Sequence, residues 1–591
     1  MSERASVSAD ADEESAETRD EDESEQQPVT TGAQSVIRAL ENAGTEYVFG
    51  VQGGAIMPVY DALYDSDINH VTMAHEQGAS HAADAYGIVS GEPGVCFATS
   101  GPGATNLVTG IADANMDSDP MIALTGQVPT EFVGNDAFQE TDTVGITQPV
   151  TKHSYFADSP NAVGDDVGEA WALANEGRQG PTLVDLPKDV TQGEADREPK
   201  APQIPDTYNP PEEADDAEVQ DAAEALADST QPVILAGGGV IKAEASNELR
   251  EFAKEYEIPV ITTMPGIGSF PEDHELSLSW AGMHGTGYAN LAITNTDCML
   301  AIGTRFDDRL TGGVETFAPD AELIHVDVDP AEISKNIHAD YPLIGDARAV
   351  LRQLFDAMPS APEAEAWREQ CQEWKADYPM EYDAPADEPL KPQYIVETFS
   401  EVTPDDTIVT TGVGQHQMWA SQYWTYREPR TWVSSHGLGT MGYGVPSAIG
   451  AKLAAPDQEV VCFDGDGSFL MTVQGLSVAV RENLDITYVV LNNEAVGMVR
   501  QWQDGFYEGR RMASEYPWIP QFDKLAEAFG ARGFRLEDHD DVEETIQAAR
   551  DYDGPSVIDA IIDPAENVYP MVPSGGDNGL FALNEEHLGN L

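Results

Sequence analysis

The sequence has few basic residues. Its 591 residues include 30 Lys and Arg against 105 Asp and Glu, which gives a formal net charge of -75 at pH 7. A field of this sign repels nucleic acid and anionic membranes, so the composition argues against both as partners. The acid excess recurs in every surface-like segment and is not confined to one tail. We therefore predict a halophilic protein of a very salty cytoplasm, in which the repulsion between acidic groups is screened.

Cysteines and long apolar runs are also scarce. Four cysteines in a chain of this length do not make a disulfide framework. Cys96 and Cys462 lie inside apolar strand-like runs and are expected to be buried as small apolar residues. No signal peptide opens the chain, and no apolar run is long enough to span a bilayer. These absences predict a soluble, cytoplasmic protein.

The chain is long enough for several domains, each able to bury its own core. Its start is acidic, rich in Ser and almost free of large apolar residues, which predicts a disordered acidic tail at residues 1–29. Short apolar runs then alternate with helical patterns, which is typical of parallel sheets covered by helices. We expect an α/β protein with three doubly wound parallel-sheet domains at residues 30–195, 212–357 and 393–565, followed by a C-terminal arm at residues 566–591.

Two Pro-rich stretches, at residues 199–211 and 358–392, separate the three blocks and are expected to be a linker and a connector. The first ordered helix is expected at residues 32–42, with Thr31 as its cap. Apolar runs predict strands at residues 47–51, 71–73, 95–99, 121–125 and 182–185 in the first block, and at residues 233–236, 260–263, 298–302 and 323–328 in the second.

Two segments of the chain resemble each other. The segments that begin at His75 and Ser435 both read as a small-residue helix, a strand containing Val-Cys-Phe and a Gly-x-Gly turn. Chance accounts for this as readily as duplication, because βα units share their composition. A duplication would imply two like-folded domains that flank a different middle one.

The third block holds a dense group of candidate ligands. An apolar run at residues 460–463 ends in Asp-Gly-Asp-Gly, a helix-like segment follows at residues 470–484, and a second apolar run at residues 486–491 ends in Asn-Asn. A right-handed crossover would bring Asp466 and Asn493 to the same edge of the sheet, where ligands bind. Their oxygens suit Mg²⁺, and the glycines allow a phosphate close to the backbone. Two ordinary turns rich in Asp, Asn and Gly are the alternative.

This stretch resembles the diphosphate-binding signature of thiamine diphosphate enzymes, in which GDG is followed further along by NN. From Thr31 to Gly576 the sequence resembles the large catalytic subunits of the acetohydroxyacid synthase (acetolactate synthase) family. The resemblance is carried by FGVQGGAIMPVYD, HEQGASHAADAYG, TSGPGATN, GQVPTEFVGNDAFQE, VDLPKDV, GMHG, GTRFDDRLTG, SHGLGTMGYGVPSAIGA, GDGSF, LNNEAVGMVRQWQ and VPSGG.

The resemblance implies a transferase of branched-chain amino acid biosynthesis that uses thiamine diphosphate, Mg²⁺ and FAD. Its substrates would be pyruvate and, as acceptor, a second pyruvate or 2-oxobutyrate. In the family, the first domain binds the cofactor's pyrimidine and the third its diphosphate, and two subunits complete one site. The resemblance therefore also implies a homodimer or homotetramer, with a small regulatory subunit as a further partner. FAD is thought to be structural there, because the net reaction involves no redox change.

Glu76 matches the family residue that hydrogen-bonds the pyrimidine ring and so starts the removal of the thiazolium proton. A first-turn Glu that complements a helix dipole is the alternative. The implied metal ligands are Asp466, Asn493 and the backbone carbonyl of Ala495. The other residues implied for thiamine diphosphate are Val413, Gly414, Gln415, His416, Gly439, Met441, Gly465, Gly467 and Ser468, together with Asn493.

Residues implied for the substrates come from several segments. Arg309 would meet an incoming carboxylate, with a surface ion pair to Asp307 or Asp308 as the alternative. Trp502 would favour 2-oxobutyrate over pyruvate, a discrimination worth about 1–3 kcal/mol, with an ordinary core or interface Trp as the alternative. The resemblance further implies Gln139 and Lys188 as catalytic residues and Phe138, Met498, Ser574, Gly575 and Gly54 around the substrates.

The middle block carries a weaker signal. Three glycines follow a predicted strand, but they lack the full GxGxxG spacing of a dinucleotide site. GMHG and RFDDR favour FAD, and a domain without FAD is the alternative. The implied FAD contacts are Arg178, Gly237, Gly238, Gly239, Thr263, Met283, His284, Arg305, Arg309, Asp327 and Asp346.

Two other functions share this scaffold. A pyruvate oxidase would use FAD to oxidise the reaction intermediate, and a catalytically inert subunit would bind the cofactor without turnover. Trp502, Arg309 and the VPSGG arm favour the carboligase over the oxidase, while Glu76, Asp466 and Asn493 argue against an inert subunit. The sequence departs from the family at Gln52, where the family usually has Pro, which affects the role of Gly54.

Overall fold

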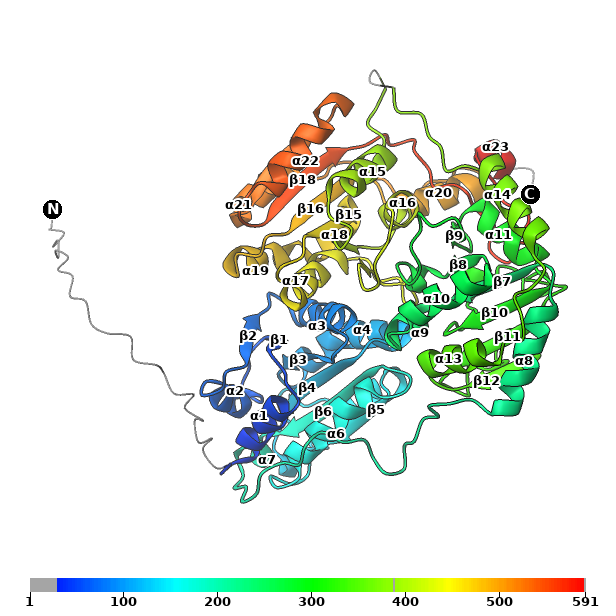
Figure 1. Ribbon diagram of the computed structural model, residues 1–591. Helices are drawn as coiled ribbons and strands as arrows, with labels where there is room; N and C mark the ends of the chain where they lie inside the picture. The colour runs from blue at the N-terminus through cyan, green and yellow to red at the C-terminus, as the bar shows by residue number, and fades with distance from the viewer. Residues whose placement is uncertain (1–28, 386–387, 589–591) are drawn as a thin grey trace, which may run out of the picture.

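The computed structural model describes residues 29–385 and 388–588 and contains three α/β domains, each built on one six-stranded sheet (Figure 1). Every paired strand in these sheets is parallel, which confirms the fold class predicted from the sequence. The tail predicted to be disordered was placed at residues 1–29, and residues 1–28 of it lie outside the described residues. Among the described residues, no helix has both the length and the apolar content that a membrane crossing requires.

The first domain begins at the predicted helix, which Thr31 caps by accepting a hydrogen bond from the Gln34 backbone N–H at 3.2 Å. Its sheet has the order β2-β1-β3-β4-β6-β5. The strands are β1 Tyr47–Gly50, β2 Asn69–Thr72, β3 Gly94–Ala98, β4 Met121–Gln127, β5 His153–Phe156 and β6 Pro181–Pro187. The helices are α1 Gly32–Asn42, α2 Met57–Leu63, α3 Glu76–Ser90, α4 Pro102–Asp117, α5 Thr143–Thr147, α6 Val163–Asn175 and α7 Lys188–Gln192.

The third domain repeats this topology. Its sheet has the order β14-β13-β15-β16-β18-β17, so the ranks of its strands match those of the first sheet position by position. This agreement favours duplication over chance. The strands are β13 Ile408–Thr411, β14 Trp432–Val433, β15 Val460–Gly465, β16 Thr487–Asn492, β17 Arg532–Leu536 and β18 Ser556–Ile561. The helices are α15 Pro392–Val402, α16 Gln415–Tyr423, α17 Gly444–Ala454, α18 Asp466–Thr472, α19 Leu476–Arg481, α20 Gly497–Phe506, α21 Phe522–Phe529 and α22 Val542–Arg550.

The middle domain has a different sheet, with the order β12-β11-β10-β7-β8-β9. Read from β9, its ranks are third, second, first, fourth, fifth and sixth, the order of doubly wound dinucleotide-binding domains. The strands are β7 Pro232–Ala236, β8 Val260–Thr262, β9 Ser277–Trp280, β10 Cys298–Ile302, β11 Glu322–Asp327 and β12 Tyr341–Ile344. The helices are α8 Asp216–Asp228, α9 Gly238–Lys242, α10 Ser246–Tyr256, α11 Gly287–Asn295, α12 Asp308–Thr311, α13 Ala347–Ala357 and α14 Glu365–Asp377.

Three sequence-based predictions need correction. The helix expected at residues 470–484 is broken by the 3₁₀ turn Val473–Gly475 between α18 and α19. The stretch expected as a connector contains α14, whose Trp367 and Cys371 are buried in the middle domain's core and hold it there. Strands β5, β9 and β12 were missed because each lies at a sheet edge, where β5 has no buried residue and β12 has one, so neither carries a continuous apolar run.

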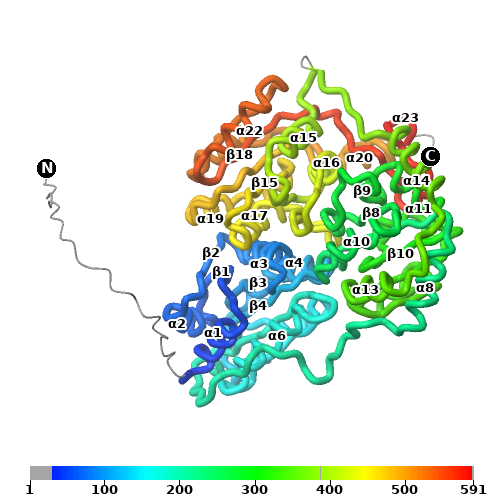
Figure 2. Tube along the Cα trace, in the orientation of Figure 1, coloured from blue at the N-terminus to red at the C-terminus, as the bar shows by residue number. Residues whose placement is uncertain are grey.

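The first and third domains share a core. Helix α3 packs against α17, and buried alanines of α3, including Ala79 and Ala82, lie in one cluster with Val445 and Ile449 of α17. The helices approach so closely that a Cβ at Gly450 would collide with the Ala82 carbonyl oxygen. Figure 2 shows α3 and α4 directly beside α17. This contact fixes the first domain against the third.

The C-terminal arm returns to the middle domain. The Val572 backbone N–H donates to the Met283 carbonyl at 2.8 Å, and the arm ends in the short helix α23 Glu585–Leu588, near α11 and α14 (Figure 1). All four cysteines are free and buried, as predicted for Cys96 and Cys462.

Candidate functional site

The carboxyl edge of the third sheet brings the predicted metal ligands together. Asp466 follows β15 and Asn493 follows β16, its neighbour in the sheet. One carboxylate oxygen of Asp466 accepts a hydrogen bond from the Ala495 backbone N–H at 3.1 Å. Asn493 donates its amide nitrogen to Gln415 at 3.1 Å, which turns its amide oxygen away from Gln415. The Asp466 carboxylate and the Asn493 amide thus lie at the ends of two neighbouring strands, with the Ala495 backbone hydrogen-bonded to the carboxylate.

This donor set fits Mg²⁺. Mg²⁺ takes few protein ligands and completes its octahedron with water and phosphate oxygens. Among the described residues no group of three His, Cys, Asp or Glu side chains forms a metal site, so a metal that needs such a cluster has none there. Burial raises the pKa of the Asp466 carboxyl to about 7, and a bound cation would favour its ionised form.

The glycines around this edge leave room for a phosphate and for little else. A Cβ at Gly467 would lie 2.5 Å from the Tyr516 hydroxyl, and one at Gly465 would lie 2.7 Å from Nδ1 of His416. A Cβ at Gly497 would collide with the Gln415 side chain. Close packing therefore requires glycine at these positions, and backbone without side chains is what a diphosphate site uses.

The segment from Val413 to His416 begins α16 beside this edge. Gly414 has a φ of 153°, a conformation that favours glycine. His416 lies 3.4 Å from the buried Asp464 carboxylate, and burial lowers the pKa of His416 to about 3. The imidazole is therefore neutral across the physiological range, so it can offer a phosphate a hydrogen bond but no charge.

The loop that carries Gly439 and Met441 lies over the same edge. Gly439 has a φ of 70°, and a Cβ there would meet only Val413, at 3.9 Å, so the space beside it is open. Ser468 accepts a hydrogen bond from the Gly442 backbone N–H at 2.9 Å, which ties this loop to α18. The open space beside Gly439 fits a flat ring. We call the loop that carries Gly439 and Met441 the bed.

A cavity of about 1080 Å³ extends from this bed into the middle domain. Val413, Gly414 and Gly439 line one end of it, together with Met498, Trp502 and Arg309. The Arg309 guanidinium lies 5.8 Å from the Trp502 ring and also pairs with Asp308 at 3.1 Å. The ion pair with Asp308 is thus present, and Arg309 also lines the cavity; its contact with a substrate carboxylate stays a prediction. Trp502 packs against Phe506, and its indole N–H is buried without a partner.

The first-domain residues implied for catalysis and substrate do not line this cavity. Glu76 begins α3 and accepts a hydrogen bond from the Asn106 side chain at 3.0 Å. Gln139 has a φ of 61° and Phe138 is 87% exposed, in a loop before α5, while Lys188 begins α7. Within one chain, the residues implied for one site therefore form two groups. Glu76, Phe138, Gln139 and Lys188 form the group away from the cavity, and the residues at the third-sheet edge form the group beside it.

Most of the residues implied for FAD line two cavities that share part of their lining. Arg178, Thr263 and Arg305 line both the cavity described above and a second one of about 830 Å³. Met283, His284 and Arg309 line the first, and Gly238, Gly239, Asp327 and Asp346 line the second. Gly237 lines neither; it packs against Gly303, where a Cβ would collide.

The shape of the two cavities suits a long ligand. The second cavity lies at the glycine-rich carboxyl edge of the middle sheet, and the first continues toward Trp502. Burial lowers the pKa of His284 to about 4 and raises that of Asp327 to about 6. A neutral His284 and a carboxyl beside a dinucleotide fold fit a flavin dinucleotide.

Ser574 and Gly575 are exposed in the arm, whose Gly576 carbonyl accepts from the Gly313 backbone N–H at 2.7 Å. Gly54 and Gln52 are exposed in the turn after β1, and a Cβ at Gly54 would meet nothing within 4 Å. None of these four residues lines either cavity.

Functional candidates in the linker and in α4 were not predicted from the sequence. Tyr208, taken only as part of a Pro-rich boundary, lines the first cavity and lies 4.8 Å from the Lys152 ammonium. Lys152 donates to the Leu173 carbonyl at 2.6 Å, and burial lowers its pKa to about 8. Asp117 ends α4 and contacts both other domains. The one sequence signal for Asp117 is its spacing of four residues from Asp113 on a predominantly apolar helix.

Comparisons with known proteins match three family models in chain order. Residues 30–146 match the thiamine pyrophosphate enzyme N-terminal TPP binding domain, residues 219–354 the central domain and residues 412–560 the C-terminal TPP binding domain. Each matched segment falls on one of the three sheets.

Curated proteins give longer matches. The chain is 48% identical to the acetolactate synthase large subunit of Corynebacterium glutamicum over 562 residues, which cover 93% of this chain and 89% of that protein. It is 46% identical to the acetolactate synthase of Mycobacterium bovis, over 93% of this chain and 90% of the relative. It is also 46% identical to the probable acetolactate synthase large subunit of Methanocaldococcus jannaschii, over 92% and 94%.

Proposed function

Because the chain belongs to the acetolactate synthase family of thiamine pyrophosphate enzymes, we propose that it decarboxylates pyruvate and joins the remaining two-carbon unit to a second 2-oxo acid. Pyruvate as acceptor gives 2-acetolactate, and 2-oxobutyrate gives 2-aceto-2-hydroxybutyrate. The observation that carries the proposal is the edge of the third sheet, where Asp466, Asn493 and Ala495 meet beside the cavity lined by Arg309 and Trp502.

Thiamine diphosphate supplies, when bound, the reactive carbon and the electron sink that decarboxylation needs. Asp466, Asn493 and the Ala495 carbonyl would hold Mg²⁺ and, through it, the diphosphate. Arg309 would bind the carboxylate of an incoming 2-oxo acid, because its guanidinium faces the cavity over Trp502. The apolar wall of Met498 and Trp502 would exclude water from the new carbon–carbon bond.

Trp502 would set the choice of acceptor. An apolar wall distinguishes one methylene by about 1–3 kcal/mol, which is roughly fivefold to 150-fold in product ratio. The test supplies equal pyruvate and 2-oxobutyrate, with Mg²⁺, thiamine diphosphate and FAD, and measures both products. Trp502→Leu should lower the share of 2-aceto-2-hydroxybutyrate while total turnover falls less. Trp518→Leu is the matched control, because Trp518 is 77% exposed and lines neither cavity. An unchanged ratio in Trp502→Leu removes that role.

Two copies of the chain would be needed for one site. Glu76 does not line the cavity beside Asp466 within one chain, so a homodimer in which Glu76 of one copy faces the third domain of the other would unite the two groups. The test mixes two inactive variants, Glu76→Gln and Asp466→Asn, under conditions that exchange subunits. Mixed dimers should recover a substantial part of wild-type activity, because one site keeps both wild-type residues. No recovery, with exchange confirmed, would place both residues in one chain's site.

FAD would fill these two cavities in a structural role, because joining two 2-oxo acids with loss of CO₂ transfers no net electrons. Arg178 and Arg305 carry positive charge toward them, and Gly238 and Gly239 bring the backbone close. Flavin should co-purify or bind at low concentration, and Gly239→Val should abolish this because any Cβ there meets Gly303. A small regulatory subunit would be a further partner, because the names of two relatives contain "large subunit". Co-purification would test this.

A further inference from the structure

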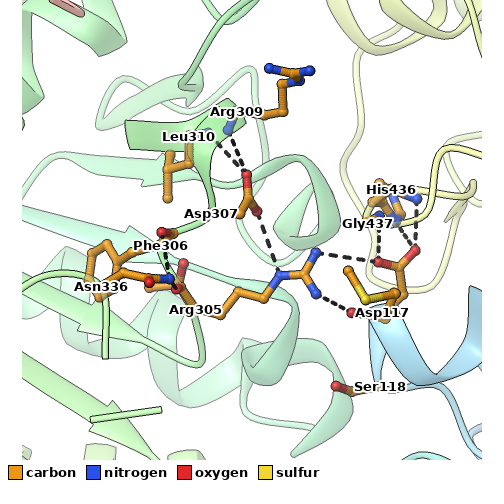
Figure 3. A network of polar contacts seen from close by, with 12 residues as sticks. Asp117, Ser118, Arg305, Phe306, Asp307, Arg309, Leu310, Asn336, His436 and Gly437 are labelled. Atoms are coloured by element: carbon orange, nitrogen blue, oxygen red, sulfur yellow. Dashed lines mark hydrogen bonds and ion pairs between the residues drawn. The ribbon is translucent and has the colours of Figure 1, made fainter. Parts of the chain in front are cut away.

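The three domains meet at the carboxylate of Asp117, the last residue of α4. One of its oxygens accepts a hydrogen bond from the His436 backbone N–H and the other accepts from that of Gly437, both at 2.7 Å. The Arg305 guanidinium of the middle domain lies 4.0 Å from the same carboxylate and donates to the Met116 carbonyl of α4 (Figure 3). Asp117 is buried, and hydrogen bonds from His436 hold its pKa below the ordinary value against the opposing effect of burial.

The His436 ring adds a directed contact. Trp432 donates its indole N–H to Nε2 of His436 at 2.9 Å, and an indole N–H is a donor only. Nε2 must therefore be the acceptor, which leaves the ring proton on Nδ1, 3.4 Å from the Asp117 carboxylate. Both backbone and side chain of this residue thus favour an ionised Asp117.

One turn earlier on α4, Asp113 anchors the same loop. It accepts a hydrogen bond from the Ser435 hydroxyl at 2.6 Å, and that hydroxyl accepts from the Thr440 backbone N–H at 2.8 Å. Ser435 therefore closes residues 435–440 into a loop and joins that loop to α4 through Asp113. This loop carries Gly439 and leads into Met441, the bed of the proposed thiamine site.

Arg305 packs closely against this loop. A Cβ at Gly437 would collide with the Arg305 guanidinium and would lie 2.8 Å from the Asp117 carboxylate. On its other side Arg305 faces Asp307 at 3.7 Å, and Asp307 caps α12 by accepting from the Arg309 backbone N–H at 2.9 Å. Arg305 thus contacts both Asp117, which holds residues 436 and 437, and Asp307, which caps the helix that carries Arg309 (Figure 3).

We propose that Asp117 is a positioning residue that couples the flavin cavity to the thiamine bed, so that FAD and thiamine diphosphate bind cooperatively. The proposal rests on the proposed function, because it takes Arg305 as an FAD contact and Gly439 and Met441 as the bed. FAD that immobilises Arg305 would fix Asp117, and Asp117 would fix residues 436 and 437. The flavin would in this way contribute to a reaction in which it exchanges no electrons.

The test measures binding, not turnover. Full-length protein is freed of cofactors in high salt, and the Kd of Mg²⁺–thiamine diphosphate is measured by tryptophan quenching with and without saturating FAD. FAD should tighten it by about fivefold or more, and by linkage thiamine diphosphate should tighten FAD by the same factor. Asp117→Asn should reduce both factors to about one. Arg250→Ala is the control that should retain them, because Arg250 joins the middle and third domains through Arg427 and Gly268, away from the bed.

Gly437→Ala provides a second route if Asp117→Asn does not fold. It keeps the carboxylate and displaces Arg305, and it should also reduce the coupling. Retained coupling in a folded Asp117→Asn or Gly437→Ala protein overturns the proposal, as does a wild-type factor of one. Acetolactate formation without coupling would overturn the coupling alone, whereas coupling without acetolactate would overturn the function alone.

Discussion

Glu76 is the residue whose chemistry the account needs most. It begins α3, its carboxylate accepts a hydrogen bond from Asn106 at 3.0 Å, and it does not line the cavity beside Asp466. Glu76→Gln keeps the shape of this contact and removes the carboxylate, so binding of Mg²⁺–thiamine diphosphate should change little. Turnover should fall by about 10²–10⁴-fold, the usual value of one acid–base group.

Stopped-flow kinetics with pyruvate, together with a binding titration, would measure both effects. Glu46→Gln is the matched control, because Glu46 is exposed and precedes β1 at the opposite edge of the first sheet. Full activity of Glu76→Gln would remove Glu76 from the mechanism.

A second prediction at the scale of single residues concerns Glu272. Burial raises its pKa to about 7, although it accepts hydrogen bonds from the Tyr426 backbone at 2.9 Å and from Ser279 at 3.2 Å. The unfolded chain loses this proton at a lower pH than the folded one, so the contribution of Glu272 to stability should fall as pH rises from about 4.5 to about 7 and then level off.

Glu272→Gln is neutral at every pH. Relative to wild type, its melting temperature should therefore be higher at pH 8 than at pH 5, measured at one salt concentration. Exposed Glu369 supplies the control, since Glu369→Gln should show no such trend. A difference between Glu272→Gln and wild type that does not vary with pH would contradict the raised pKa.

Helix packing provides a prediction at the scale of elements. Gly450 of α17 touches the Ala82 carbonyl of α3, and backbone cannot move aside as a flexible side chain can. Gly450→Ala should lower the free energy of unfolding by about 1–3 kcal/mol, the usual cost of overpacking. Gly168→Ala in α6 is the control, because its Cβ would meet neighbours at 3.6 Å or more and Ala favours helix. Equal free energies of unfolding of Gly450→Ala and Gly168→Ala in urea would contradict the close packing of α17 against α3.

The elements differ in how far the sequence predicts them. Central strands such as β10, expected at residues 298–302 and found at Cys298–Ile302, are buried on both faces and so carry uninterrupted apolar runs. Edge strands such as β5 are half exposed and leave no such run. Helix α14 was missed because its buried Trp367 is outweighed in composition by acidic neighbours. Burial that depends on a distant partner is not visible in the local sequence.

The same limit applies to the site. Sequence motifs placed Asp466, Asn493 and Ala495 on neighbouring strands, and the structure brings them together, because strand–helix–strand geometry fixes where strand ends meet. Asp117 and Tyr208 were missed because their roles arise between domains, where no local pattern predicts which surfaces meet. Which residues the first domain adds to the site would depend on the second copy proposed above, which one chain does not contain.

At the scale of the whole molecule, charge predicts a dependence on salt. A net charge of -75 is self-repulsive, and the Debye length shortens from about 10 Å at 0.1 M to about 3 Å at 1 M salt. The melting temperature should therefore rise steeply as KCl increases over that range. Sucrose, which strengthens burial without screening charge, should not replace the salt. A melting temperature that is independent of KCl would contradict the halophilic interpretation.

The most direct test of the central claim is the stoichiometry of the reaction with pyruvate alone. The purified protein in high salt would receive pyruvate, Mg²⁺, thiamine diphosphate and FAD, while pyruvate, CO₂, 2-acetolactate and O₂ are measured together. We predict that one CO₂ and one 2-acetolactate form for every two pyruvates consumed, with no uptake of O₂. Acetate or acetyl phosphate formed with consumption of O₂ would contradict it, because the two-carbon unit would then be oxidised instead of transferred.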